Sequence, residues 1–188
     1  MRTAGDSGLR TATDGEVFFV RPSRPSDARS FLEMWREVVE ERQYVRPDTV
    51  QTGVRYWRKR FRGSWTADGA SLMAIHGSRV IGNLDVAREE GLVTRHIASI
   101  GMAVARDWRG RGVGSALMAE AIRWARSVRV EKLALSVYPH NTAARALYQK
   151  FGFREEGCLT GHSKKSIAYF DEILMGLWLV ERPPPVEA

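Results

Sequence analysis

The sequence contains a single cysteine among its 188 residues, so the chain cannot form an intramolecular disulfide. That composition fits a reducing compartment, and we expect a cytoplasmic protein. Cys158 has two interpretations, a catalytic nucleophile or a small residue within a strand. The second is favoured, because no clear histidine, asparagine or aspartate partner for a nucleophile is evident in the sequence.

Long apolar runs are also missing. None approaches the roughly 20 residues that a membrane-spanning helix needs, so we expect no membrane association. Residues 1–15 are polar and lack the apolar segment of a secretory signal. The hydrophobic fraction of 44% and the charged fraction of 27% are ordinary for a globular protein with one compact domain.

Acidic residues are outnumbered by basic ones, 22 to 29, which gives a net charge of +7. A basic protein attracts nucleic acid, membrane surfaces or polyanionic small molecules. One basic cluster, at 55–62, is interpreted as the solvated face of a helix; another, at 106–111, flanks glycines and suits a phosphorylated ligand. No nucleic-acid recognition motif accompanies the charge, so we expect no nucleic-acid partner.

Composition divides the chain into three parts. Residues 1–15 are rich in Gly, Thr and Asp and are expected to form a flexible leader. Residues 182–188 contain three consecutive prolines and are expected to form a flexible tail. Residues 16–181 show one continuous globular pattern with neither an internal repeat nor a linker.

Apolar periodicity within the domain predicts a mixed α/β fold. The pattern indicates a first strand, two helices, a hairpin, a central strand–turn–helix–strand–helix unit and two final strands. The ranges in that order are 16–20, 26–39, 50–61, 72–76 with 79–86, 96–105, 113–128, 132–138, 141–148, 153–162 and 167–180.

Two sets of residues alternate along the strand at 96–105. One set is bulkier and is expected to face the core, while the other is small and leaves room for a ligand to approach the backbone. The bulkier set is Ala98, Ile100, Met102 and Val104, and the small set is Ser99, Gly101, Ala103 and Ala105.

Three glycines, Gly110, Gly112 and Gly114, stand at alternate positions between this strand and the next helix. Glycine lets a backbone come close to a ligand, and the free N–H groups and dipole of a helix start favour an anion. Arg109 and Arg111 add positive charge, so the segment predicts a diphosphate cradle built chiefly of main chain. The segment is not a P-loop, since no lysine follows, nor a dinucleotide fingerprint, since leucine replaces the last glycine.

The segment Arg109-x-x-Gly112-x-Gly114 resembles the R/Q-x-x-G-x-G/A signature of the GNAT N-acetyltransferase superfamily. Downstream, Asn141 to Tyr148 resembles the asparagine–tyrosine helix of that family. The resemblance covers roughly residues 17–180.

A finer resemblance concerns the branch of the family. His96-x-Ala98, together with Glu155-Glu156-Gly157, is similar to the branch that acetylates small amino acids and related amines, including phosphinothricin-type substrates.

The resemblance implies a single GNAT-like domain, with a central twisted mixed sheet of about seven strands, about four flanking helices and a splay between strands four and five. Acyl-CoA would lie in that splay, with pantetheine along the fourth strand, pyrophosphate on the turn amides, and Arg109 acting by charge and by shaping the turn. The coenzyme-binding residues implied are Met102, Ala103, Val104, Arg109, Gly110, Arg111, Gly112, Val113, Gly114, Ser115, Asn141, Ala144 and Tyr148.

Asn141 has a second interpretation as a helix N-cap, and one residue can serve both uses. Ala144 is small and lies one turn before Tyr148, which would let the coenzyme pass beside the helix.

The resemblance implies an enzyme that moves acetyl from acetyl-CoA to the primary amine of a small molecule, an amino acid or related amine, by direct attack in a ternary complex. Tyr148 would be the general acid toward the departing thiolate, since a phenol with a pKa of about 10 stays protonated at neutral pH. The alternative for Tyr148 is a packed core residue.

The base is open. Glu41 is a candidate for the base or for binding the ammonium, and the alternative is an exposed surface glutamate. His96 has the same two kinds of interpretation, base or strand-end residue. The other histidines share no metal-ligand spacing, so no metal site is expected.

Other functions stay open beside the leading one. The chain is alternatively an N-acetyltransferase for protein N-termini or lysines, or a non-catalytic acyl-CoA-binding regulatory module. Retention of both Asn141 and Tyr148 argues against the last alternative. A homodimer and a monomer are equally compatible with the composition.

Overall fold

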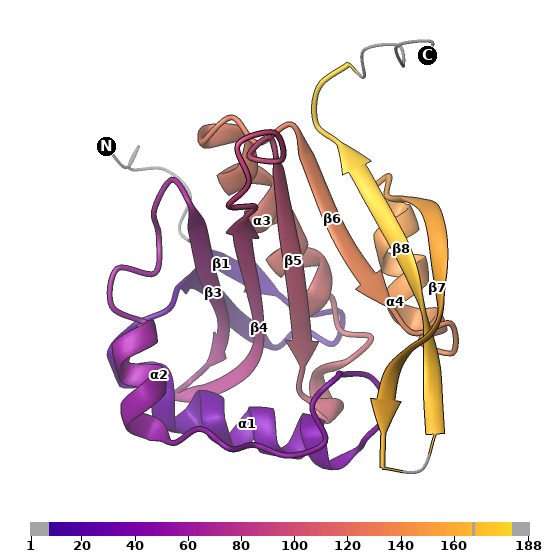
Figure 1. Ribbon diagram of the computed structural model, residues 1–188. Coiled ribbons are helices and arrows are strands. Elements are labelled where there is room, and N and C mark those ends of the chain that lie inside the picture. The colour runs from indigo at the N-terminus through magenta and orange to yellow at the C-terminus, as the bar shows by residue number, and fades with distance from the viewer. Residues whose placement is uncertain (1–7, 167, 182–188) are drawn as a thin grey trace, which may run out of the picture.

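The computed structural model describes residues 8–166 and 168–181 and contains, within them, one eight-stranded sheet, four α-helices and two short 3₁₀-helices (Figure 1). The strands are β1 (Leu9–Thr11), β2 (Val17–Pro22), β3 (Gly69–His76), β4 (Arg79–Arg88), β5 (Ile97–Val104), β6 (Lys132–Val137), β7 (Arg154–Lys165) and β8 (Ala168–Trp178). The helices are α1 (Ala28–Glu40), α2 (Val54–Arg60), α3 (Val113–Ser127) and α4 (Thr142–Lys150), with 3₁₀ turns at Pro25–Asp27 and Arg106–Trp108.

The strands lie in the order β1-β2-β3-β4-β5-β6-β8-β7, and only the β5–β6 pair is parallel. These two strands pair at Ile97↔Lys132, Ala98↔Leu133 and Ser99↔Ala134, and no further along. They therefore diverge toward their carboxyl ends (Figure 1). The expected splay between strands four and five is confirmed, and it lies between β5 and β6.

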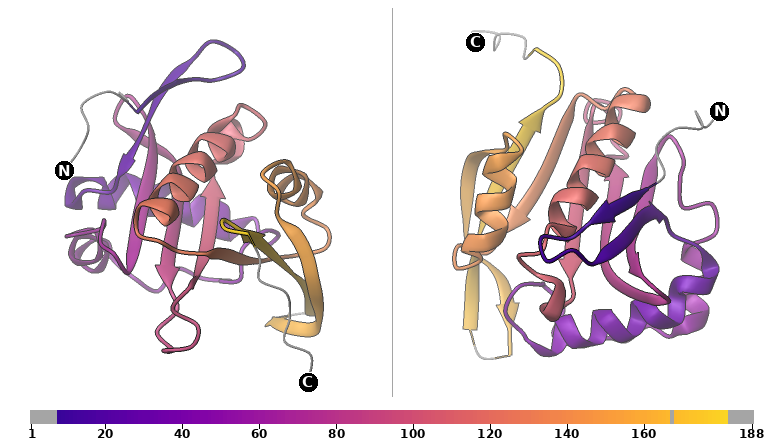
Figure 2. Two further views of the ribbon diagram at one scale, coloured as in Figure 1. Left: turned by 90° about the horizontal axis from the view of Figure 1, so that it is seen from above. Right: turned by 180° about the vertical axis from the view of Figure 1, so that it is seen from behind.

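Helix α3, predicted at 113–128, covers one face of the sheet with an apolar stripe. Leu117, Ala121 and Trp124 are fully buried, and Trp124 donates its indole N–H to the carbonyl of Thr66 at 2.9 Å. Burial of a large apolar side chain contributes about 1.5–3 kcal/mol, so this stripe anchors α3, and with it the glycine turn that precedes it. Helices α1 and α2 lie together on the opposite side (Figures 1 and 2).

The expected leader requires a correction. Residues 1–7 lie outside the described residues, as does the expected tail at 182–188, but Leu9–Thr11 form β1 and pair with β2. Leu9 lies opposite Phe19 and Thr11 lies opposite Val17. These cross-strand pairs hold the short segment in the sheet. β1 accounts for the eighth strand, where about seven were expected.

The alternation in β5 also differs from the prediction. Ala98, Ala103 and Ala105 are buried, whereas Ile100, Met102 and Val104 are only half-buried. Beyond Ser99 the strand has lost β6 as a neighbour, so its bulky side chains line the opening and are not enclosed by the core.

Two further findings concern the helices. α2 is shorter than the predicted helix at 50–61, and it buries none of its residues, as expected for a solvated basic face. Among the described residues, no helix is both long and apolar enough to cross a membrane.

Candidate active site

A cavity of about 750 Å³ opens at the splay between β5 and β6. Its walls come from α1, the α1–α2 loop, β4, β5, the glycine turn, the first turn of α3, β6, α4 and β8. Eleven of the residues predicted to bind coenzyme line it: Met102, Ala103, Val104, Arg109, Gly110, Gly112, Gly114, Ser115, Asn141, Ala144 and Tyr148. Their roles as coenzyme ligands stay predictions.

The glycine turn has backbone angles that require glycine. Gly110 has φ +72° and Gly112 has φ +91°, in the left-handed region that side chains with a Cβ rarely adopt. Gly112 is the N-cap of α3, and the first helical bond runs from the amide of Ala116 to its carbonyl. The amides between these two residues have no partner within the helix and form, with the helix dipole, a site for an anion.

Gly114 lies close to the neighbouring helix. A Cβ at this position would stand 3.0 Å from Cδ2 of Leu147 and 3.6 Å from Cε of Met102. The missing side chain therefore lets the first turn of α3 approach both α4 and β5.

Arg109 ties three segments together at the edge of the cavity. Its two terminal nitrogens donate to the carboxylate of Glu41 at 2.7 Å each, and its Nε donates to the carbonyl of Val104 at 3.0 Å. The guanidinium also lies over the ring of Tyr44, 5.1 Å from its centroid. Arg109 thus joins the end of α1 to the end of β5; its role in shaping the turn stays a prediction.

The same contacts count against Glu41 as the base. Both of its carboxylate oxygens are engaged by Arg109, and Glu41 is not among the described residues that line the cavity. The geometry assigns Glu41 to holding Arg109. The sequence could not show this pair, because 68 residues separate its members.

Arg111 and Val113 also differ from the expectation. The guanidinium of Arg111 stacks on Trp108 at 3.9 Å from the ring centroid and pairs with Asp14, and neither Arg111 nor Val113 is among the described residues lining the cavity. Val113 is 1% exposed and packs toward Gly82 of β4. Any contribution of these two residues to anion binding therefore comes from their amides.

Asn141 is the N-cap of α4. Its Oδ1 accepts a hydrogen bond from the amide of Ala144 at 3.2 Å, which confirms the capping interpretation. Asn141 and Ala144 both line the cavity, so the cap fixes the start of α4 against the opening.

Tyr148 is buried, at 7% exposed, and lines the same cavity. Burial raises its pKa to about 12, because the charged phenolate would lose hydration. The phenol is therefore fully protonated at neutral pH and available as a donor.

Sequence reasoning missed the polar pair Asn83 and Asp85 on β4. Asp85 lies opposite Gly101 of β5, and Asn83 donates to its Oδ2 at 3.4 Å. The Oδ1 atoms of both residues are buried and accept no hydrogen bond from the described residues. Both residues line the cavity, and orphaned acceptors there suit a ligand that carries N–H donors.

Burial also raises the pKa of Asp85, while Ser71 and the positive charge of Arg60 partly offset the effect. A carboxyl with a raised proton affinity in a cavity is a candidate for acid–base chemistry. The available signal was an asparagine and an aspartate at alternate positions within a largely apolar strand, Val80 to Val86.

Glu172 of β8 closes the opposite wall and is 1% exposed. Arg46 of the α1–α2 loop donates to both of its oxygens, at 2.8 and 2.5 Å, and Ser163 donates to Oε1. Burial opposes ionisation of Glu172, but the hydrogen bonds from Arg46, Ser136 and Ser163 and the charge of Arg46 outweigh it and lower its pKa to about 2. The Arg46–Glu172 pair thus connects the α1–α2 loop to β8.

Family comparison agrees with this geometry. Residues 31–153, which include the glycine turn, the Asn141 cap and Tyr148, match the model of the acetyltransferase (GNAT) family. The chain belongs to the acetyltransferase (GNAT) family. The GNAT fold expected from the sequence is confirmed.

The chain is similar to three known proteins of this kind. It is 32% identical over 105 residues to the L-amino acid N-acetyltransferase AaaT of Escherichia coli (strain K12), a match that covers 55% of this chain and 65% of AaaT. It is 30% identical over 79 residues to YwnH of Bacillus subtilis (strain 168), named as a phosphinothricin acetyltransferase, across 42% of this chain and 48% of YwnH. The matches thus span between about half and two thirds of these relatives' lengths.

The third relative is a solved structure, YncA of Salmonella typhimurium with its cofactor acetyl-CoA. The two superpose with a TM-score of 0.80 over 91% of this chain and 99% of that one, at 17% identity. At that identity the likeness concerns the GNAT fold alone.

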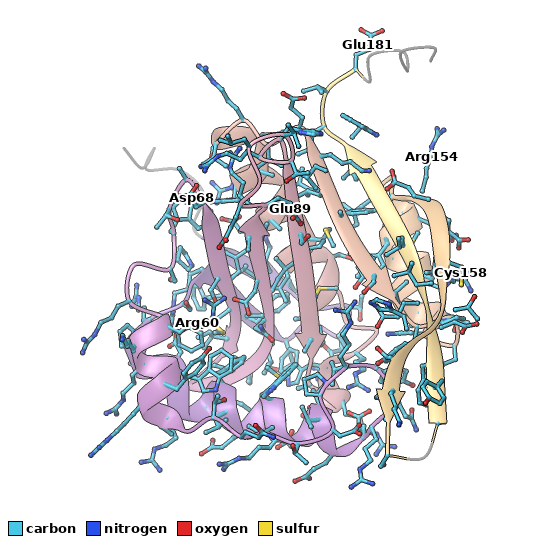
Figure 3. All side chains as sticks on the ribbon, viewed as in Figure 1. Arg60, Asp68, Glu89, Arg154, Cys158 and Glu181 are labelled. Atoms are coloured by element: carbon cyan, nitrogen blue, oxygen red, sulfur yellow. The ribbon has the colours of Figure 1, made fainter. Side chains whose placement is uncertain are left out.

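Other candidates lie outside the cavity. His96 stacks on Trp178, with ring centroids 6.2 Å apart, and is not among the described lining residues, which favours the strand-end interpretation. Cys158 is exposed on β7 (Figure 3). No cluster of three or more His, Cys, Asp or Glu side chains placed to hold a metal occurs within the described part of this GNAT domain.

Proposed function

We propose that this protein is an N-acetyltransferase that moves the acetyl group of acetyl-CoA to the primary amine of a small molecule by direct attack. The observation that carries the proposal is that one cavity brings together an amide cradle at a helix N-terminus, a protonated buried phenol and a half-buried carboxyl whose Oδ1 is buried. Family membership supports the same reaction class.

The coenzyme fits the half of the cavity beside β5. The turn from Gly110 to Ser115 offers main-chain amides to the diphosphate. Met102 to Val104 pair with β4 on one edge but belong to the part of β5 that β6 leaves unpaired, so the backbone groups on that second edge are open to the amide groups of pantetheine. The bound coenzyme supplies an acetyl thioester as acyl donor.

Asp85 is the base that the proposal favours. An amine arrives as an ammonium, and the orphaned oxygens of Asp85 and Asn83 accept its N–H donors. Asp85 then takes one proton, which frees the nitrogen lone pair to form the C–N bond. The raised pKa of Asp85 brings its proton affinity nearer to that of an amine.

Tyr148 is the proton donor to the departing sulfur as the C–S bond breaks. With a pKa of about 12 it is a weaker acid than an ordinary thiol, whose pKa is near 8.5. The same dry surroundings raise the proton affinity of the thiolate, so the hydrogen bond from Tyr148 stabilises the growing charge and the proton follows late. The acylated nitrogen then loses its second proton, which restores the phenol of Tyr148.

A small amine suits the acceptor end of the cavity. Asp85 and Glu172 line the cavity, and Arg46, which also lines it, is already paired with Glu172. The relatives named for L-amino acids and for phosphinothricin act on small amines, which supports this acceptor class.

The test incubates the protein with acetyl-CoA and separate pools of amino acids, other small amines, polyamines and short peptides, and identifies acetylated product by mass. Product identification avoids thiol reagents, which the exposed Cys158 would consume. We expect acetylation in a small-amine pool. Acetylation of peptides alone would replace this acceptor class by protein N-termini or lysines. Coenzyme binding without any product would favour a regulatory module.

A further inference from the structure

The hairpin of β1 and β2 reaches the glycine turn, although the sequence predicted a flexible leader where β1 lies. The amide of Thr13, at the hairpin tip, donates to the carbonyl of Arg111 at 3.3 Å. Figure 2 shows the hairpin beside the start of α3. Thr13 also lines the cavity that holds Gly110 and Gly112.

Arg111 is the residue of the glycine turn that contacts the hairpin. Its guanidinium is only 23% exposed and stacks on the buried ring of Trp108, 3.9 Å from the centroid. It donates to the carbonyl of Asp107 at 3.2 Å and forms an ion pair with Asp14. Three contacts thus hold the guanidinium of Arg111, which is not among the described residues that line the cavity.

This orientation has a consequence for the neighbouring glycines. Gly110 and Gly112 flank Arg111, and both have left-handed backbone angles with open space where a Cβ would be. Glycine is the most flexible residue, so such a turn does not hold its own shape. A side chain pinned between the two glycines fixes the direction in which their peptide groups point.

We propose that the β1–β2 hairpin is part of the coenzyme site, with Asp14 as a positioning residue. Asp14 holds Arg111, and Arg111 holds the turn so that its amides face the diphosphate of the coenzyme. Thr13 adds a wall at the same end of the cavity. The inference rests on the proposed function, because it assigns the diphosphate to this turn.

A competing arrangement makes the opposite prediction. If Arg111 itself bound a coenzyme phosphate, Asp14 would compete for its charge, and removal of Asp14 would strengthen coenzyme binding. The stack on Trp108 and the absence of Arg111 from the described lining residues favour positioning over competition.

The experiment measures acetyl-CoA dissociation constants by calorimetry for wild type, Asp14→Asn and Glu16→Gln. Glu16 is a matched control, since it lies next to the same hairpin tip, is also exposed, and pairs with His76 at 3.7 Å and not with Arg111. Asp14 is 46% exposed, and an exposed pair contributes about 0.2–1 kcal/mol, so we expect binding about 1.4- to fivefold weaker in Asp14→Asn. Glu16→Gln should bind as wild type does, and Asp14→Glu should recover most of the loss.

A second readout separates positioning from general loosening of the fold. S-acetylpantetheine carries the thioester but no diphosphate. With this donor the Asp14→Asn variant should have the same kcat/KM as wild type, whereas with acetyl-CoA the KM of the variant should be higher. In an Arg111→Ala background, Asp14→Asn should have no further effect.

Tighter coenzyme binding in Asp14→Asn, or equal losses in Asp14→Asn and Glu16→Gln, would overturn the inference and leave the proposed function intact. A wild-type protein that binds no acetyl-CoA would overturn both.

Discussion

Burial raises the pKa of both Tyr148 and Asp85, and this suits one as a proton donor and the other as a proton acceptor. Tyr148 keeps its proton at any pH near neutrality, whereas Asp85 gains proton affinity but can still ionise. The two residues come from different walls of the cavity, α4 and β4, which leaves space for the reacting groups between them.

Replacing Tyr148 by phenylalanine removes only the hydroxyl. We expect kcat to fall about 100-fold or more, the usual range for loss of a general acid, with acetyl-CoA affinity kept. Steady-state kinetics and calorimetry measure the two quantities, and thermal unfolding confirms that the ring still packs. An unchanged kcat would remove Tyr148 from the acid role.

Replacing Asp85 by asparagine keeps the shape and removes the base. We expect kcat/KM near neutral pH to fall about 100-fold. In the wild type, activity should fall as the pH drops through the raised pKa of Asp85, because the protonated carboxyl cannot accept a proton. That limb of the pH–rate profile should vanish in the variant. Asp68→Asn, which alters an exposed pair with Arg95, is the control; an equal loss there would contradict the assignment.

At the scale of elements, the α1–α2 loop is held by two arginine–glutamate pairs, one at its start and one within it. Arg109 holds Glu41 at the end of α1, and Arg46 within the loop holds Glu172 of β8. Lys165 adds hydrogen bonds to the carbonyls of the loop at Arg42 and Val45, each at 2.9 Å. The loop therefore bridges the two halves of the splayed sheet.

The Arg46–Glu172 pair makes stability depend on pH. The pKa of Glu172 in the folded protein is about 2, below its ordinary value of 4.5. The ionised Glu172 therefore stabilises the folded state fully above about pH 4.5, and this contribution is lost as the pH falls toward 2. Glu172→Gln should lower the free energy of unfolding at pH 7 by about 2–3 kcal/mol, and the difference from wild type should shrink across that window. Denaturant unfolding at several pH values measures this.

Glu155→Gln is the control for that experiment, because Glu155 is 44% exposed in its pair with Arg145. Loss of the Glu155–Arg145 ion pair should lower the free energy of unfolding by at most about 1 kcal/mol. Equal costs for the two variants would contradict a special role for the buried pair.

The glycine turn should tolerate no acidic residue. Gly112→Asp adds a strained side chain at φ +91° and a negative charge beside the proposed diphosphate site, so we expect acetyl-CoA affinity to fall more than tenfold. Gly77→Asp, at φ +57° in the β3–β4 turn, introduces similar strain and charge elsewhere. Calorimetry should show normal affinity for the Gly77 variant; normal affinity for the Gly112 variant would remove the diphosphate assignment.

At the scale of the whole molecule, the sequence predicted what depends on local pattern. The periodicity of α3, the glycines before it and the Asn141 cap are each encoded within a few residues, and the splay followed from family resemblance. The partners of Glu41 and Glu172 lie 68 and 126 residues away, so no local pattern reveals them. β1 was missed because its three residues form a strand only through β2.

The most direct test of the account is the initial-rate pattern when acetyl-CoA and the identified amine are varied together, in wild type and in Cys158→Ser. Direct transfer within one cavity predicts intersecting double-reciprocal lines, the mark of a ternary complex, in both proteins. Parallel lines in the wild type, with activity lost in Cys158→Ser, would show an acetylated enzyme intermediate at Cys158 and contradict direct attack.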